Sequence, residues 1–349
     1  MSPIRELLLQ GTSWQPLHGG RSSDGLPVSS FVLGETKPAA VNTGLNVNGV
    51  TIAELTTVSG NVTYSTNNVV VERRRFTGKV SITGKNITFR DCWFNSGTFA
   101  NAMVQCTNAN VENITFENCL FRPPSPGTAG EANVANYGAC LVGDRFTMIR
   151  CDLSWACDGI DVQGASSGAR DVTILGSYFH DLTYFSPYTL PDMSVSWADN
   201  QTHNDCIQIV TPALTRFRLE GCTLECMFDT AVGNASQAPT FDTEGDLVSG
   251  NKYYPNMQGM AVFMTGSGSR TLSEIVVHKN WMYGSSTYVN WGDSTTGSGE
   301  LHFTDNRWLR GQRLGDLYTL MMRQSEFQKM TVTGNYYLDT GEQWNGRRG

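Results

Sequence analysis

ITFRDCWF at residues 87–94 is followed by ITFENCLF at residues 114–121, and both octapeptides alternate apolar and polar positions before a polar bend and a second apolar pair. Such alternation is typical of short, half-buried β-strands. Further copies are VVVERRRF (69–76), FTMIRCDL (146–153), VTILGSYF (172–179), FRLEGCTL (217–224), DLVSGNKY (246–253), IVVHKNWM (275–282), LHFTDNRW (301–308) and MTVTGNYY (330–337). The pattern indicates a repeat protein.

Most of these units recur after 26 to 32 residues. That period is too short for a four-stranded propeller blade, and the signature of leucine-rich repeats is missing. One coil per unit, stacked at the strand spacing of about 4.8 Å, fits the period. We therefore predict an all-β chain: a single-stranded right-handed parallel β-helix of about nine to ten coils at residues 51–349. Residues 1–50 carry no unit, and we expect them to form an N-terminal arm or cap.

The sixth position of each unit holds a small or amide side chain. In order along the chain it is Cys92, Cys119, Cys151, Ser177, Cys222, Asn251, Asn280, Asn306 and Asn335. Equivalent positions stack in a β-helix, so the pattern predicts an internal ladder whose asparagines hydrogen-bond along the axis. Cysteines in such a ladder act as small apolar side chains, and we expect all nine cysteines to be free thiols.

Charge and hydropathy exclude two classes of partner. The formal net charge is −7, which argues against nucleic-acid binding because that requires a basic surface. No run of 18 apolar residues occurs, so no membrane insertion is expected. The apolar stretch Leu7–Leu9 is too short for the core of a signal peptide, so none is expected.

One interval between units is longer, 45 residues, and it places a loop insertion at residues 183–203. Insertions in solenoids map to one face, often the binding face. The loop carries Tyr184, Tyr188 and Trp197 and follows His180. Aromatic rings can stack on the C–H faces of sugars, so these four residues are candidates for substrate binding. The alternative is that the loop packs its aromatic rings against itself.

Aspartates are concentrated in the coils beside this insertion. CDGIDV (157–162), NDCIQI (204–209) and FDT (228–230) align in register, which predicts a carboxylate ladder and stacks Asp161 on Gln208. Adjacent carboxylates repel, so one of them should have a raised pKa or the group should bind a cation such as Ca²⁺; no other cofactor is expected. The candidate catalytic residues are Asp158, Asp161, Asp205, His203 and Asp229, with Asp205 as the acid, and Gln208 is a candidate for substrate binding. Alternatively, the aspartates serve only to satisfy backbone groups at turns.

With these motifs, the chain resembles the pectate-lyase-like β-helix superfamily over about residues 55–345. The segment H-N-D-C-I-Q at 203–208 looks like the H-[ST]-D-x-I-Q segment of β-helix proteins of actinobacteria and their phages. Two features depart from the enzymes of the superfamily. No lysine lies between Lys85 and Lys252, although pectate lyases use basic residues, and Cys157-Asp158-Gly159 only half matches a polygalacturonase motif. Neither set of catalytic residues can be transferred.

Tailspikes and minor tail proteins of phages share this fold and bind, and often cleave, polysaccharides of the host surface. The resemblance therefore implies a virion tail protein, exposed extracellularly and made without a signal peptide. It also implies a homotrimer, with other tail proteins attached through residues 1–50 and a host glycan as ligand. The alternatives are a pectate-lyase-like carbohydrate-active enzyme, either a glycoside hydrolase or a polysaccharide lyase, and a non-catalytic structural β-helix.

Overall fold

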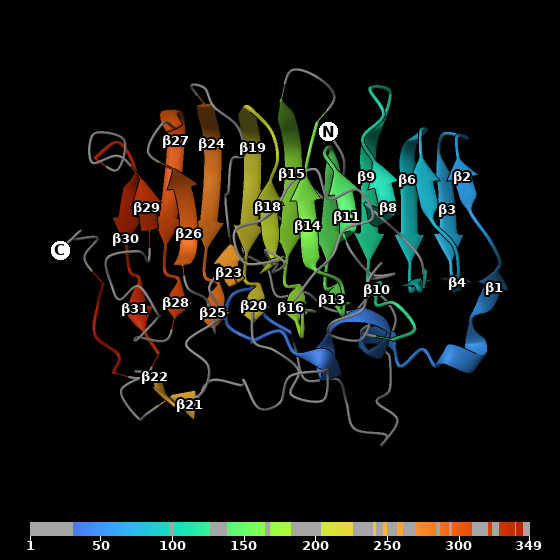
Figure 1. Cartoon of the computed structure of the whole chain (residues 1–349), viewed down its shortest axis with the longest axis horizontal. Coiled ribbons are helices and arrows are strands. Elements are labelled where there is room, and N and C mark those ends of the chain that lie inside the picture. Colours follow the sequence, from blue (N-terminus) through green and yellow to red (C-terminus); the bar gives the residue numbers. More distant parts are fainter. Residues whose placement is uncertain are drawn as a thin grey trace.

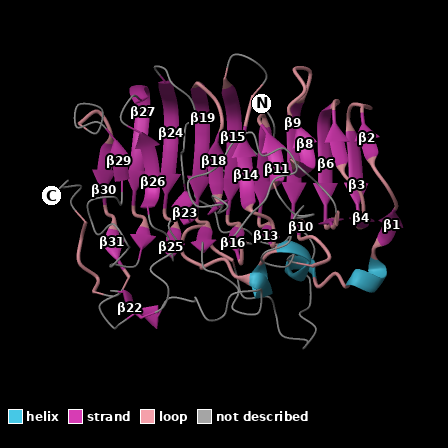
Figure 2. Cartoon of the chain, in the orientation of Figure 1, coloured by secondary structure: helices cyan, strands magenta, loops and turns pink. Residues whose placement is uncertain are grey.

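The computed structural model describes residues 31–97, 101–125, 138–164, 168–182, 204–225, 240–241, 247–249, 257–260, 270–283, 287–292, 295–308, 320–322, 328–338 and 340–344. Within these ranges the chain is nearly all β-strand, and the strands stack in long parallel sheets (Figure 1). The few helices are short and lie along one side of the stack (Figure 2). This all-β architecture is consistent with a parallel β-helix, as the repeat predicts.

Two long sheets run along the stack. Sheet 1 has ten strands: β1 (Thr56–Val58), β4 (Arg74–Phe76), β7 (Trp93–Phe94), β10 (Leu120–Phe121), β13 (Asp152–Ser154), β16 (Tyr178–His180), β20 (Thr223–Glu225), β25 (Trp281–Tyr283), β28 (Arg307–Trp308) and β31 (Tyr336–Tyr337). Sheet 2 has nine: β3 (Val69–Glu72), β6 (Lys85–Arg90), β9 (Glu112–Glu117), β12 (Phe146–Ile149), β15 (Ala169–Leu175), β19 (Ala213–Glu220), β24 (Arg270–His278), β27 (Thr295–Thr304) and β30 (Thr331–Thr333).

The remaining parallel strands form two shorter sheets. Sheet 3 contains β2 (Val62–Tyr64), β5 (Val80–Ile82), β8 (Ala102–Cys106), β11 (Ala139–Gly143), β14 (Asp158–Val162) and β18 (Ile207–Ile209). Sheet 4 contains β17 (Asn204–Asp205), β23 (Met257–Met260), β26 (Thr287–Gly292) and β29 (Leu320–Met322). Because β17 and β18 are separated by Cys206 alone, sheet 4 begins where sheet 3 ends.

Inward-facing side chains of successive coils stack on one another in the core. The rings of Phe76, Phe94 and Phe121 follow one another on β4, β7 and β10, with centroid separations of 5.2 and 4.6 Å. Phe89 and Phe116 form a second stack, 5.5 Å apart, on β6 and β9. Stacked aromatic pairs stabilise a core beyond the area that they bury. Equivalent positions in the sequence units are thus neighbours in space, which is the physical content of the predicted repeat.

The predicted internal ladder is present. The backbone N–H of Cys222 donates to Asn280 Oδ1 at 2.9 Å, that of Asn280 to Asn306 Oδ1 at 3.1 Å, and that of Asn306 to Asn335 Oδ1 at 2.9 Å. Earlier in the stack, the Cys151 N–H donates to Ser177 Oγ at 3.1 Å. Eight cysteines of the described ranges are buried free thiols, as predicted, and Cys226 lies outside those ranges.

One predicted unit, residues 246–253, is not a coil. Its described part, β22 (Leu247–Ser249), pairs antiparallel with β21 (Thr240–Phe241), and β19 pairs directly with β24. Asn251 lies outside the described residues, and Cys222 is followed in the ladder by Asn280. A short apolar run before Gly-Asn fits a hairpin as well as a coil, so periodicity could not separate them. The chain therefore has a second long connection between coils, after β20, in addition to the insertion at residues 183–203.

Residues 31–55, called the strap below, lie along the side of the stack and lead to β1 (Figure 1). They include the 3₁₀ helices η1 (Ala40–Asn42), η2 (Gly44–Asn48) and η3 (Ile52–Glu54). The Gly34 carbonyl accepts a hydrogen bond from Arg307, the Gly44 N–H donates to the Arg150 carbonyl, and Asn48 donates to Asp91. The strap thus crosses many coils. The described part of the predicted arm packs against the side of its own chain rather than over the first coil.

The strap packs against the bends that connect strands of sheet 2 to strands of sheet 1. Gly176 lies in the bend between β15 and β16 and has a φ of +53°, a conformation that glycine adopts without strain. A Cβ at this position would also lie 2.8 Å from the ring of Phe31. Leu45, Val50 and Leu55 pack with Trp93 in a small apolar cluster of their own. Residues 1–30 lie outside the described ranges, and attachment through them stays a prediction.

Candidate functional site

The sequence-predicted site residues divide into two groups. Asp158, Asp161, Asp205, Gln208 and His180 belong to the described ranges. Tyr184, Tyr188, Trp197, His203 and Asp229 lie outside them, as does the whole insertion at 183–203, and their roles stay predictions. The site can therefore be built from the carboxylates and their neighbours on sheets 3 and 4.

Asp158, Asp161, Asp205 and Gln208, called the carboxylate cluster below, lie on two neighbouring coils. Asp161 on β14 is in register with Gln208 on β18, as predicted. The backbone N–H of Asp205 donates to Asp158 Oδ1 at 2.7 Å, which joins the end of β17 to the start of β14. The alignment of the D-G-I-D and N-D-C-I-Q segments is thus confirmed for these two coils.

Small and amide residues allow the two coils to approach closely at this point. A Cβ at Gly159 would lie 2.4 Å from the Cys206 carbonyl oxygen, so this position requires glycine. Asn204 is fully buried, and its Nδ2 donates to the Cys157 carbonyl at 2.7 Å. These contacts hold the backbone on either side of Asp158 and Asp205. The glycine and asparagine of the two motifs therefore position the carboxylates, a role that sequence analysis did not assign to them.

The next coil does not continue the aspartate ladder as predicted. Asp205 on β17 pairs with Gln258 on β23, and Asn204 pairs with Met257. The prediction that Asp229 stacks on Asp205 is therefore wrong. The physical reason is the long connection after β20, which places Asp229 before the strand that forms the next coil.

Asp161 has a pKa that is raised toward neutrality. Burial and the charge of Asp205 raise the pKa of Asp161 to about 7. Its Oδ1 is buried and has no hydrogen-bond partner within the described part of the chain. The predicted raised pKa therefore occurs in this cluster, but at Asp161. Asp161 is therefore a second candidate for the acid, and the assignment of Asp205 as the acid stays a prediction.

His180 lies on sheet 1 and belongs to a different group of charges. Its Nε2 is 3.1 Å from Asp152 Oδ1, its Nδ1 is 2.5 Å from Asp181 Oδ2, and its ring stacks on Tyr178. Arg122 Nη2 also approaches Asp152, at 3.3 Å. Burial lowers the pKa of His180, but the hydrogen bonds to Asp152 and Asp181 outweigh this and raise it to about 9.

His180 is therefore a cation that lies between two carboxylates, and its ring contacts Asp152, Asp181 and Tyr178 rather than the carboxylate cluster. Sequence analysis missed Asp152 and Asp181. Asp181 could have been noticed, because it follows His180 directly in the sequence. Asp152 could not, because its contact with His180 depends on how β13 pairs with β16.

Within the described ranges, no group of three or more histidine, cysteine, aspartate or glutamate side chains is arranged to hold a metal ion. Ca²⁺ binding at the carboxylate cluster stays a prediction. Among the helices of those ranges, none is long and apolar enough to span a membrane.

Comparison with known proteins found no matching family model, no matching curated protein and no matching solved structure. The resemblance to the pectate-lyase-like superfamily stays a prediction that depends on the repeat and on the motifs at residues 157–162 and 203–208.

Proposed function

We propose that this protein is a phage virion tail protein that binds a polysaccharide of the host cell surface and hydrolyses it at the carboxylate cluster. In this proposal the sheets form one right-handed β-helix of nine to ten coils. The protein is a homotrimer, exposed on the tail, and residues 1–50 provide the attachment to other tail proteins.

The observation that carries the proposal is the raised pKa of Asp161 beside two further aspartates. Glycoside hydrolysis requires one protonated carboxyl group to donate a proton to the leaving oxygen, and a second carboxylate to act as base or nucleophile. An acid is most effective when its pKa lies near the working pH, which holds for Asp161. Asp158 and Asp205, on the same two coils, are the candidates for the second role.

A hydrolase fits these residues better than a lyase. A lyase that acts on uronates requires a basic group to neutralise the carboxylate and remove a proton. No lysine occurs between Lys85 and Lys252, so only an arginine such as Arg145, Arg170 or Arg216 could serve, and these three already pair with Asp144 or Asp171. Asp161 has buried Val142 as its neighbour on the preceding coil and Gln208 on the next. The polar partner for a sugar hydroxyl group therefore lies on the Gln208 side of Asp161.

The test is incubation of the purified protein with host-envelope polysaccharide, followed by measurement of new reducing ends and of unsaturated uronates. Asp161→Asn should lower turnover by a factor of about 10² or more and should leave glycan binding intact. Asp171→Asn is a matched control, because Asp171 is a surface aspartate on sheet 2 that pairs with Arg216. It should retain full turnover.

Reducing ends at the parent rate from Asp161→Asn would refute the assignment of the acid. Unsaturated products would identify a lyase. Binding without any product would leave a tail protein that binds but does not cleave, and absence of binding would contradict the proposal as a whole.

A further inference from the structure

Arg150 is a buried cation at the bend between β12 and β13. Its side chain lies below the strap: the guanidinium stacks on the Phe31 ring at 4.5 Å, and Nη2 donates to the Asn42 carbonyl at 3.1 Å. The residue is only 5% exposed, yet its Nε has no hydrogen-bond partner within the described part of the chain. A buried donor on a charged group is costly unless an acceptor occupies the adjacent space.

Arg145 on the neighbouring bend shows how the same fold satisfies a buried guanidinium elsewhere. It is 7% exposed, and its Nε donates to Asp144 Oδ1 at 2.9 Å. Arg150 has Glu117 as the nearby acidic residue whose charge acts on it, but burial dominates and lowers its pKa to about 10. The structure thus provides Arg145 with a contacting carboxylate and Arg150 with backbone and aromatic partners only, among the described residues.

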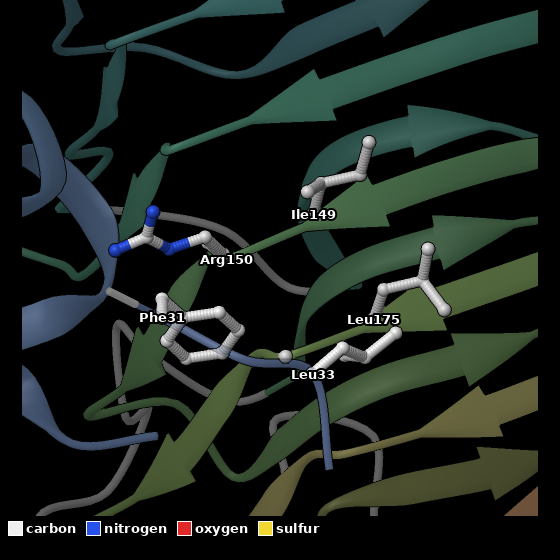
Figure 3. A pocket seen from close by; sticks show the side chains of 6 residues that line it. Phe31, Leu33, Ile149, Arg150 and Leu175 are labelled. Carbon is white, nitrogen blue, oxygen red and sulfur yellow. The ribbon is translucent and has the colours of Figure 1, made fainter. Parts of the chain in front are cut away.

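A small pocket adjoins Arg150 (Figure 3). Its lining is Phe31, Leu33, Ile149, Arg150, Leu175 and Gly176. The strap provides one wall, and sheet 2 provides the other, because Ile149 and Leu175 are in-register neighbours at the ends of β12 and β15. The pocket has room for about one water-sized species. Apart from Arg150, the residues that line it are apolar or glycine.

We propose that this pocket binds a small monovalent anion, chloride or bromide, which accepts a hydrogen bond from Arg150 Nε and is enclosed by the strap. A guanidinium is weakly hydrated, and with apolar walls it suits a weakly hydrated halide. The small volume disfavours phosphate and sulfate. The anion would supply the counter-charge that Arg150 lacks, and it would join Phe31 and Leu33 of the strap to sheet 2. The proposal is independent of the carboxylate cluster.

Anomalous diffraction from crystals of the full chain grown in sodium bromide tests the site directly. We expect a bromide peak within hydrogen-bonding distance of Arg150 Nε. Density in the pocket without anomalous signal would show water there and would overturn the proposal.

Chloride NMR line broadening tests it in solution. The native protein should broaden the chloride resonance, and Arg150→Gln should lose most of that broadening, whereas Arg145→Gln should keep it. Leu33→Trp fills the pocket and retains the guanidinium, so it should lose the broadening as well, and it serves if Arg150→Gln does not fold. Equal broadening by the native protein and by Leu33→Trp would overturn the proposal.

Discussion

Asn306→Ala should destabilise the stack through hydrogen bonds that join three coils. Asn306 is fully buried. Its Nδ2 donates to the Val277 carbonyl and to Asn335 Oδ1, both at 3.0 Å. Its Oδ1 accepts from the backbone N–H of Asn280 at 3.1 Å and from Asn280 Nδ2 at 2.9 Å. Alanine removes all four bonds from a site that water does not reach.

The cost of Asn306→Ala in unfolding free energy depends on which buried groups lose all of their hydrogen-bond partners. The Asn280 N–H is left buried without its acceptor, which costs about 1–3 kcal/mol. Asn280 Nδ2 keeps the Leu219 carbonyl, so the other losses are partial, at about 0.5–1.5 kcal/mol each. With three such partial losses the terms sum to about 2.5–7.5 kcal/mol, and we expect the lower part of this range, about 2.5–4 kcal/mol, because groups that keep a second partner lose less than a full hydrogen bond. Urea unfolding followed by circular dichroism should show a lower midpoint at an unchanged slope, and exchange of the Asn280 amide should accelerate.

A matched control comes from an asparagine ladder on the surface. Asn86 is exposed, donates to Asn68 at 2.9 Å and accepts from Asn113 at 2.9 Å. Its φ of +53° is one that glycine tolerates, so Asn86→Gly removes the amide without backbone strain. Water replaces the lost partners, and the cost should stay below about 0.5 kcal/mol. If Asn306→Ala and Asn86→Gly lowered the free energy of unfolding equally, the argument that burial makes the internal ladder important would be refuted.

Three further predictions concern the thiols, the strap and the pH dependence. Thiol titration without reductant should find nine reactive groups in urea and almost none in the native state, and fewer groups in urea would reveal a disulfide. Gly176→Ala should cost roughly 2–3 kcal/mol and expose the strap to protease, because its Cβ would meet Phe31, whereas Gly60→Ala has open space and should cost roughly 1 kcal/mol. The folded-state pKa of His180 is raised to about 9, so its contribution to stability is complete below about pH 6.5 and is lost as pH rises through 9; His180→Gln should remove that part of the pH profile of the thermal midpoint. The pKa of Asp161 is also raised in the folded state, so the free energy of unfolding should decrease as the pH rises from about 4 to 7. In Asp161→Asn this decrease should be smaller.

The sequence predicted the coils well wherever successive units had similar spacing. The ladder that joins Cys222 to Asn280, Asn306 and Asn335 follows from aligning octapeptides. The pairing of Asp161 with Gln208 follows from aligning the segments at residues 157–162 and 204–209. The alignment failed at residues 246–253, where an antiparallel hairpin carries an apolar run before Gly-Asn. Alternation of apolar and polar residues predicts that a strand can form there, but it does not predict with which other strand it pairs.

The candidate site was predictable in its location and not in its chemistry. Asp158 and Asp205 were placed together correctly, because D-x-φ segments of adjacent coils superimpose. The raised pKa of Asp161 could not be predicted, since it depends on the burial of Asp161 and on the charge of Asp205 beside it. The placement of Asp229 was wrong because the length of the connection after β20 shifts the register of the next coil.

By itself the sequence determined the strand class, the period and the internal ladder, because each depends on side chains that recur within one coil and the coil is the unit of stacking. Only the tertiary structure decided where the strap lies and what Arg150 and His180 contact. Phe31 and Arg150 are far apart in sequence, and no periodic pattern relates them. His180 meets Asp152 from a neighbouring strand of sheet 1. Contacts of this kind arise when whole segments are packed side by side, so they follow from the assembled fold and not from the pattern within a unit.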